Sequence, residues 1–303
     1  MTDIAPPRSP RQTFLIGLAI AVIGAILFST KAIVAKLIYR YPVDAVTLIA
    51  FRMLFSLPFF AAIAFWQSRV STALSHKEKV NIVLLGLIGY YVSSFLDFLG
   101  LQYISAGLER LILFLTPSFV LLISIVLWKK KISGIEWGAL LISYLGTVLV
   151  FVHDVRMGGA QVLVGSAFVL GSAVSYALYL LYSGEMVRRV GAIRLVASAM
   201  CVSSFACIAQ FFLLRPVSML IQPAAIYGLS MFNAVFCTVL PVFLTMIAVA
   251  RIGAATTSQA GMVGPVSTLF LSAVVLNEPI TGIQLCGTAL VLAGIYLLSQ
   301  KRT

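Results

Sequence analysis

Ten apolar stretches divide this chain, and each has the length of a helix that crosses a lipid bilayer. A hydrocarbon core of about 30 Å needs about 20 apolar residues in helical form. The stretches cover residues 14–39, 43–66, 80–102, 104–128, 134–152, 162–184, 193–214, 223–248, 252–276 and 280–299. With 61% hydrophobic and only 10% charged residues, the composition is far more apolar than that of a soluble domain. The sequence therefore predicts an all-α membrane protein with ten transmembrane helices.

The second half of the chain repeats the pattern of the first half. A shift of 148 positions lays the stretch Ile104–Val150 on the stretch Ile252–Leu298. Pro117 then coincides with Pro265, and two glycine pairs coincide as well, Gly134/Gly282 and Gly146/Gly294. In so apolar a chain, two aliphatic residues meet often by chance, whereas helix-breaking residues are placed for a backbone reason. We therefore expect two five-helix units, residues 14–152 and 162–299, after a cytoplasmic tail of residues 1–13.

Lys and Arg residues collect on one side of the predicted membrane. Of the 21, fourteen lie in the tail or in loops on one side, and three lie on the other: Arg40, Arg156 and Arg215. Short cytoplasmic loops are rich in Lys and Arg, so both termini are expected in the cytoplasm. Because five is an odd number, the two units must enter the membrane in opposite senses. Such an inverted repeat is typical of transporters with a substrate site near the membrane midplane.

The remaining composition argues against several other classes of protein. The net charge of +12 comes largely from these loops, which predicts contact with the lipid bilayer and not with nucleic acid. The two histidines, His76 and His153, fall on opposite sides of the membrane, and the chain has no HExxH or P-loop motif. The four cysteines lie inside apolar stretches, as packing residues do. We therefore expect no enzyme activity, no metal and no cofactor.

The repeated stretches share a recognisable pattern. Each has an Ala/Gly-rich start, a mid-helix Pro, a short polar turn and a last helix punctuated by Gly. This pattern resembles the EamA-type domain of the drug/metabolite transporter superfamily in its tandem, ten-helix form. The turn at 277–280 matches the family's Gly-Glu-x-Ile/Leu turn, whereas the basic residues at 129–131 replace its acid in the first half. The resemblance implies an exporter of amino acids or other small metabolites in a bacterial inner membrane. It also implies a central cavity between the first, third, fourth, sixth, eighth and ninth helices.

Five charged residues lie well inside the predicted spans, more than three residues from either end: Lys31, Arg52, Asp97, Glu109 and Arg110. Each would cost about 2.5–3.5 kcal/mol or more if it faced lipid, so they must face one another, a cavity or an interface. Lys31, Asp97 and one of the two neighbours on the fourth helix have similar depths, near the outer end. We expect Lys31 or Arg110 to bind a substrate carboxylate. Asp97 or Glu109 would bind a substrate amine or a coupling proton. The alternatives are structural salt bridges or snorkelling near the outer face.

Neutral side chains on the presumed cavity helices complete the candidate site. Asn233 and Gln259 offer hydrogen bonds without the cost of a charge, although such groups also join helices. Aromatic rings would favour apolar or aromatic solutes, and the candidates are Tyr90, Tyr176, Tyr179, Phe236 and Phe243. The alternative is that these rings only reflect membrane composition.

Proline and glycine positions suggest how the helices move and pack. Pro117 and Pro265 each remove a helical hydrogen bond, to the carbonyls of Leu113 and Gly261, and we expect them to be paired gating hinges. Kinks without a moving role are the alternative. The stripes Gly134/Gly138/Gly146 and Gly282/Cys286/Gly294 admit close helix approach. They predict packing within a monomer, with a homodimer seam as the alternative.

These features predict an alternating-access transporter for a small-molecule substrate. Small amphipathic metabolites are expected, above all amino acids with aromatic or apolar side chains. A sugar-phosphate or nucleotide-sugar antiporter of the same superfamily is the first alternative, but it would need Lys or Arg deep in the second half to hold phosphate. A non-transporting sensor or scaffold is the second.

Overall fold

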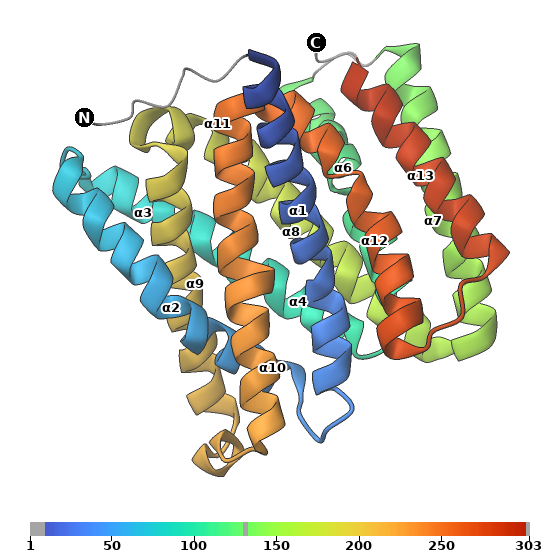
Figure 1. The fold of residues 1–303 in the computed structure, drawn as a ribbon, viewed down its shortest axis with the longest axis horizontal. Helices are drawn as coiled ribbons and strands as arrows, with labels where there is room; N and C mark the ends of the chain where they lie inside the picture. The colour runs from blue at the N-terminus through green and yellow to red at the C-terminus, as the bar shows by residue number, and fades with distance from the viewer. Residues whose placement is uncertain (1–9, 130–132, 301–303) are drawn as a thin grey trace, which may run out of the picture.

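The computed structural model describes residues 10–129 and 133–300, and in these ranges the chain forms a bundle of helices without strands (Figure 1). The α-helices are α1 (Pro10–Ile38), α2 (Ala45–Val70), α3 (His76–Gly86), α4 (Ser93–Leu101), α5 (Ala106–Leu113), α6 (Thr116–Trp128), α7 (Gly134–Gly158), α8 (Ala160–Val190), α9 (Ala192–Leu214), α10 (Ala224–Ala234), α11 (Leu240–Ala260), α12 (Val263–Leu271) and α13 (Gly282–Gln300). Three segments are π-helical, namely η1 (Leu87–Val92), η3 (Val235–Val239) and η4 (Ser272–Leu276), and η2 (Val217–Leu220) is a 3-10 turn.

The apolar helices confirm the predicted fold class of an all-helical membrane protein. In the described ranges, eight helical stretches are apolar and long enough to cross a membrane. Two shorter apolar helices follow, Val263–Leu276 and Gly282–Leu297. Helix α1 already begins at Pro10, within the predicted tail. Residues 1–9 of that tail, together with Lys130 and Lys131 of the basic turn, lie outside the described residues.

The ninth predicted span departs most from an unbroken helix. Gly253 has φ 79° and ψ 162°, backbone angles that favour glycine, and the eighth span ends there. The chain then continues to Ala260, turns at Gly261 and Met262, and resumes as α12. The expected single helix over 252–276 is therefore a pair of shorter helical pieces, because Gly253 interrupts it near its start and Pro265 removes the helical partner of the Gly261 carbonyl.

The backbone carries the same repeat as the sequence. The π-helical segments η1 and η3 begin 148 positions apart, in the third and eighth spans. Lys129 and Asn277 are also 148 positions apart, and both adopt the left-handed conformation, with φ of 50° and 57°. Among the described residues, no other non-glycine residue has a positive φ, which is a costly conformation away from glycine. The fourth and ninth spans therefore end in the same way.

Helices α7 and α13 begin with the same cap. Ser133 N–H donates to Glu136 Oε2 at 2.8 Å, and Glu136 N–H donates to Ser133 Oγ at 3.4 Å. At the positions 148 residues later, Thr281 N–H donates to Gln284 Oε1, and Gln284 N–H donates to Thr281 Oγ1, both at 3.2 Å. Each box satisfies two amide groups that a helix start would leave without partners. The chain thus contains two copies of one structural unit.

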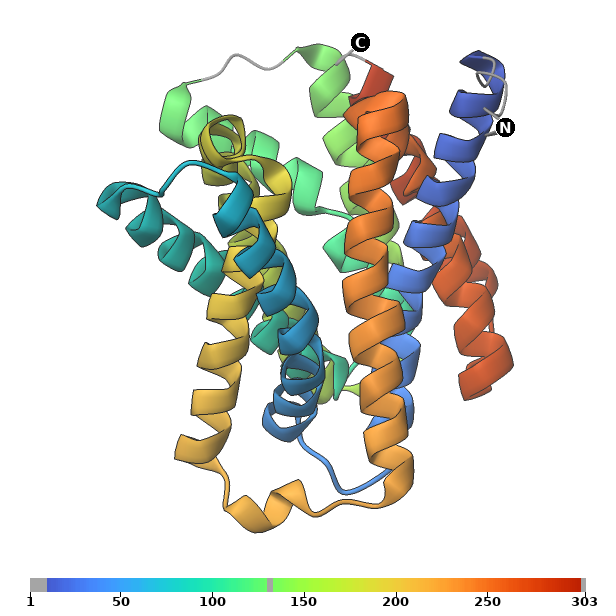
Figure 2. The same cartoon turned by 60° about the vertical axis from the view of Figure 1, so that its left-hand side comes forward.

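The two copies lie upside down relative to each other. Helix α1 begins at the end of the bundle where both termini lie, whereas α8, the first helix of the second copy, begins at the opposite end (Figure 1). The helix pairs follow this inversion: α2 packs against its equivalent α9, and α7 packs against its equivalent α13. Helix α1 packs against α11, two helices that lie side by side in Figures 1 and 2, and α8 packs correspondingly against α4. Contacts across the inverted repeat therefore hold the bundle together.

Small residues bring α7 and α13 close together. A Cβ added at Gly146 would lie 2.6 Å from the carbonyl oxygen of Gly287, and one added at Gly294 would lie 2.1 Å from Ser143 Oγ. Such distances leave no room for a side chain. Three other glycines of the predicted stripes have open space beside them: Gly134, Gly138 and Gly282. The stripe is thus a contact inside the chain at Gly146 and Gly294.

We expect Gly146→Ala to lower the free energy of unfolding by about 1–3 kcal/mol, because the added methyl group meets the α13 backbone. The melting temperature in detergent measures this effect. Gly138→Ala on the same helix is the matched control, since nothing lies within 4 Å of its added Cβ. Equal melting temperatures for the two variants would contradict the close contact.

Asp44 and Arg215 join α2 to α9 at the end of the bundle opposite the termini. Asp44 caps α2 by accepting a hydrogen bond from Thr47 N–H at 2.9 Å, and its carboxylate forms an ion pair with the Arg215 guanidinium. Partial burial alone would raise the pKa of Asp44. The hydrogen bonds from Thr47 and the ion pair with Arg215 outweigh burial, and the net effect holds the pKa of Asp44 below its ordinary value.

Because the pKa of Asp44 is lower in the folded chain, its carboxylate stabilises the fold above the unfolded pKa of about 3.9, and this contribution is lost as pH falls through the folded pKa. Asp44→Asn keeps a good capping residue but removes the charge. We expect this variant to melt below the wild type at about pH 6, and the gap to close toward about pH 3. Melting curves across this range test the effect, and a gap that does not change with pH argues against the ion pair.

Candidate functional site

The candidate site is a cavity of about 350 Å³ among the helices of both units. Its walls come from α1, α2, η1, α4, α5, α6, α8, α9, η3 and α11. The lining residues are Phe28, Lys31, Arg52, Gly89, Tyr90, Ser93, Ser94, Asp97, Arg110, Leu113, Phe114, Thr116, Pro117, Ser172, Tyr176, Leu180, Met200, Thr238 and Val242. Four of the five predicted intramembrane charges therefore lie on one cavity, and only Glu109 is set behind its wall.

A second cavity, of about 500 Å³, lies at the end of the bundle that holds the termini, between α3 and α8. Its charged groups are exposed: Glu185 and Arg189 pair across one helical turn with 66% and 60% of their side chains accessible. Solvent screens such a pair, so it holds a ligand weakly. Ile88 lines this outer cavity and Gly89 lines the first, inner cavity, so η1 lies between the two. The buried charges make the inner cavity the stronger candidate.

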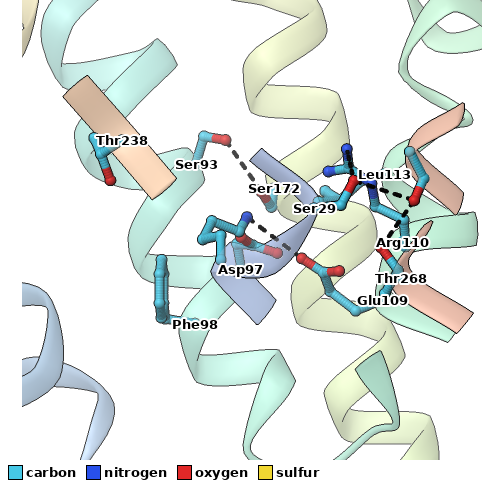
Figure 3. Close-up of polar contacts among 12 residues, drawn as sticks. Ser29, Ser93, Asp97, Phe98, Glu109, Arg110, Leu113, Ser172, Thr238 and Thr268 are labelled. Atoms are coloured by element: carbon cyan, nitrogen blue, oxygen red, sulfur yellow. Dashed lines mark hydrogen bonds and ion pairs between the residues drawn. The ribbon is translucent and has the colours of Figure 1, made fainter. Parts of the chain in front are cut away.

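Lys31, Asp97 and Glu109 form a cluster of charges at the inner cavity. Lys31 Nζ on α1 lies 2.5 Å from Asp97 Oδ2 on α4 and 3.4 Å from Glu109 Oε1 on α5. Figure 3 shows the Asp97 and Glu109 side chains approaching each other from their two helices. All three residues are buried, at 5%, 3% and 0% exposure. Charges this far from water are stable only when they are paired, so this contact fixes how three helices meet.

The cluster does not satisfy all of its own atoms. Asp97 Oδ1 and both carboxylate oxygens of Glu109 accept no hydrogen bond within the described part of the chain. The Lys31 ammonium also lies over two aromatic rings, 5.5 Å from the centroids of Phe28 and Phe98. Carboxylate oxygens and ring faces both attract cations, so the surroundings of Lys31 Nζ are strongly favourable to positive charge.

Two arginines face the cavity without a carboxylate partner within 4 Å among the described residues. Arg52 Nε donates to Thr238 Oγ1 at 2.8 Å, and its guanidinium lies over Phe98. Arg110 Nη2 donates to Ser29 Oγ at 3.1 Å, a contact drawn in Figure 3. Arg52 Nη1 and Arg110 Nε have no hydrogen-bond acceptor in the described chain. Because guanidinium groups stay charged, these two buried donors carry positive charge that no carboxylate within 4 Å balances in the described chain.

The two hinge candidates lie just after breaks in their helices. Pro117 lines the cavity, and α5 ends four residues before it, at Leu113. The Leu113 carbonyl accepts a hydrogen bond from Thr116 Oγ1 at 2.6 Å. In the second unit, the Gly261 carbonyl accepts from Gly264 N–H at 2.9 Å, ahead of Pro265. Both carbonyls that lose a helical partner to proline therefore find another one.

Tyr90, Tyr176 and Tyr179 form one aromatic cluster at the cavity wall. Tyr90 OH donates to Tyr179 OH at 3.1 Å, and the ring centroids of Tyr90 and Tyr176 lie 4.9 and 5.5 Å from that of Tyr179. Tyr90 and Tyr176 line the cavity, whereas Tyr179 lies behind them. Gly89 permits the cluster, since a Cβ there would lie 2.3 Å from Tyr179 Cγ. The predicted tyrosines are therefore brought together.

Other predicted residues lie away from the cavity. Phe236 is 42% exposed and stacks on Phe232, which turns it toward the outside of the bundle. Asn233 is fully buried, and its side-chain amide has no hydrogen-bond partner among the described residues. Phe243 packs near Phe60. Gln259 and Pro265 do not line the cavity either.

Sequence reasoning missed several residues that line the cavity. Phe28 lies one helical turn before Lys31, a spacing that places both on one face of α1. Thr238 stands 148 positions after Tyr90, so the repeat itself pointed to it. Ser93 and Ser172 share a hydrogen bond of 3.0 Å between their hydroxyls, and no motif in the sequence marks either one.

We expect Lys31→Met to lower the free energy of unfolding by about 3–5 kcal/mol, because it leaves two carboxylates buried without their cation. Glu109→Gln removes the surplus negative charge and should cost less. Lys31→Met/Glu109→Gln should lose less unfolding free energy than the two single variants lose together, since fewer unpaired charges remain. Melting in detergent tests the cycle, and additive losses would show that Lys31 and Glu109 do not interact.

Relatives of the chain agree with this architecture. A protein of Bacillus subtilis (strain 168), named uncharacterized transporter YcbK, is 29% identical over 283 residues, which cover 89% of this chain and 88% of that protein. The S-adenosylmethionine/S-adenosylhomocysteine transporter of Chlamydia muridarum (strain MoPn / Nigg) is 37% identical over 83 residues, 25% of each chain. One crystal structure superposes with a TM-score of 0.65 over 95% of this chain and 99% of that chain, at 16% identity, which shows a common fold.

The sequence profile of the EamA-like transporter family matches the chain twice, over residues 15–152 and 163–300. These matches cover both copies of the inverted unit. The chain belongs to the EamA-like transporter family of the drug/metabolite transporter superfamily, as a tandem of two EamA units.

Proposed function

We propose that this transporter exports amino acids or their derivatives, with aromatic or other apolar side groups, across the inner membrane of a bacterium. The observation that carries the proposal is the charge of the cavity. Arg52 and Arg110 line it without a carboxylate partner within 4 Å in the described chain, and the Asp97 carboxylate lines it as well. A zwitterion matches both charges: its carboxylate suits the arginines, and its ammonium suits Asp97.

The apolar part of the cavity favours a solute with a ring. Four aromatic residues line it: Phe28, Tyr90, Phe114 and Tyr176. Stacking and edge contacts with such rings stabilise a bound aromatic group, and desolvation favours an apolar one. The partly matching S-adenosylmethionine/S-adenosylhomocysteine transporters support the same class, because both of their named solutes are amino acids that carry an aromatic base.

Charge placement favours this solute over a sugar phosphate. A phosphate group binds best between several cations, and the cavity's cations all come from the first unit. From the described residues of the second unit, Arg194 is buried, but it donates to the Thr72 carbonyl at the end of the bundle and does not line the cavity. The cavity also includes carboxylate Asp97, which would repel a phosphate.

The inverted repeat and the broken helices that carry Pro117 and Pro265 support an alternating-access mechanism. The two units bind the solute between them, and rocking of one against the other opens each side in turn. Pro117 and Pro265 are the proposed hinges, because they lie at equivalent places in the two units. The basic loops support a cytoplasmic position for the termini.

Transport of labelled tyrosine by the purified protein in liposomes tests the proposal. We expect efflux above that of empty liposomes, with competition by phenylalanine and by S-adenosylmethionine but not by glucose 6-phosphate. Competition by glucose 6-phosphate alone would support the sugar-phosphate alternative. Efflux no faster than from empty liposomes, for all of these solutes, would favour a sensor or scaffold.

The role of Arg110 gives the same experiment a residue-level test. Arg110→Met should raise the KM for tyrosine by about tenfold or more, as expected when a charge-assisted hydrogen bond is lost. Tyramine has the same ring and amine but no carboxylate, so its KM should change much less. Gly138→Ala, far from the cavity, serves as the control. Equal effects on both solutes would argue against a carboxylate at Arg110.

A further inference from the structure

The Lys31 ammonium lies in surroundings that have the composition of a binding site for an organic cation. Two carboxylates approach it, from Asp97 at 2.5 Å and Glu109 at 3.4 Å. Two aromatic rings, Phe28 and Phe98, face it with centroids at 5.5 Å. Proteins hold ligand ammonium groups with this combination of carboxylates and ring faces. We name these four residues the cation cradle.

We propose that the cation cradle is the binding site for the substrate's organic cation, an ammonium or a sulfonium, and that Lys31 occupies it whenever no substrate is bound. This inference rests on the proposed function. The side chain of Lys31 is then a tethered substitute for the ligand. It lets the empty transporter return to its solute-loading conformation without binding a second solute.

The hydrogen-bond inventory argues against a purely structural salt bridge. One ammonium serves two carboxylates, and three of their four oxygens accept no hydrogen bond in the described chain: Asp97 Oδ1, Glu109 Oε1 and Glu109 Oε2. Buried polar groups are ordinarily satisfied, because an unsatisfied one costs free energy. Lys31 therefore satisfies the two carboxylates only in part, as a substitute for the ligand would. Lys31, Asp97 and Phe28 line the cavity, whereas Glu109 and Phe98 lie behind them.

The same charges limit the transport cycle. A carrier must change conformation once with its solute and once without it to move solute in one direction only. Without a cation, Asp97 and Glu109 would be two buried like charges, which disfavours any closed empty state. Lys31 supplies that cation from within the chain. We therefore expect net transport in the wild type, and we expect loss of Lys31 to leave only exchange of one solute for another.

Efflux and exchange in liposomes separate these roles of Lys31. Wild type should release labelled tyrosine into buffer without tyrosine, whereas Lys31→Met should release it about tenfold or more slowly, yet still exchange it when tyrosine is outside. Lys31→Arg should keep net release, because it keeps the charge. Lys36→Met is the matched control on α1, since Lys36 forms no ion pair within 4 Å among the described residues.

Methylammonium gives a direct test of the vacated cradle. Added on both sides of the membrane, it should restore net release by Lys31→Met, whereas equimolar sodium should not. Wild type that only exchanges, or a variant that loses release and exchange equally and is not rescued, overturns the proposal.

A binding measurement keeps this test separate from the proposed function. Methylammonium should raise the melting temperature of Lys31→Met/Glu109→Gln, which keeps Asp97 and has fewer unpaired charges than Lys31→Met. It should not raise that of the wild type, whose cradle is full. The neutral triple variant, with Asp97→Asn added, should show no shift. This measurement does not depend on tyrosine transport. If methylammonium raises the melting temperature of the double variant but tyrosine is not transported, only the proposed solute is wrong. If the melting temperature of the double variant does not rise, the cation cradle is wrong.

Discussion

Removing charged groups from water has a large cost, and this cost governs how the helices of the first unit meet. Lys31, Asp97 and Glu109 belong to three different helices, yet each is stable in its place only because the others lie beside it. The rings of Phe28 and Phe98 continue the contact, because each also faces one of the two arginines. A salt bridge, its aromatic walls and the cavity are therefore one structure. The aliphatic packing around it constrains the arrangement of the helices less than these charges do.

The backbone is nearly symmetric, but the site is not. The positions 148 residues after Lys31 and Glu109 hold Tyr179 and Thr257, which carry hydroxyl groups in place of charges. The second unit instead contributes neutral groups, such as the Thr238 hydroxyl that holds the guanidinium of Arg52. A solute between the units meets a charged wall on one side and an uncharged wall on the other. One backbone plan thus yields a site that can orient an unsymmetrical solute.

The sequence allowed the fold and the charged part of the site to be predicted, because both follow from strong constraints. Span lengths are set by the membrane, and buried charges have few acceptable surroundings. The aromatic residues of the site were harder to predict. Phe236 was chosen for its ring alone, and it faces outward, whereas the polar residues of the same span, Ser230, Asn233 and Thr238, are buried. Pro265 predicted the bend at Gly261, because it removes the helical partner of that carbonyl. The break at Gly253 escaped prediction, because a single glycine in an apolar helix is usually tolerated.

The bond that Thr116 makes beside Pro117 has a mechanical consequence. In an ordinary helix, bending breaks backbone hydrogen bonds that have no substitute in a membrane. Here the Leu113 carbonyl is held by a hydroxyl on a rotatable side chain. The angle between α5 and α6 can therefore open or close while that carbonyl keeps a donor, so this joint is softer than the rigid rods on either side of it.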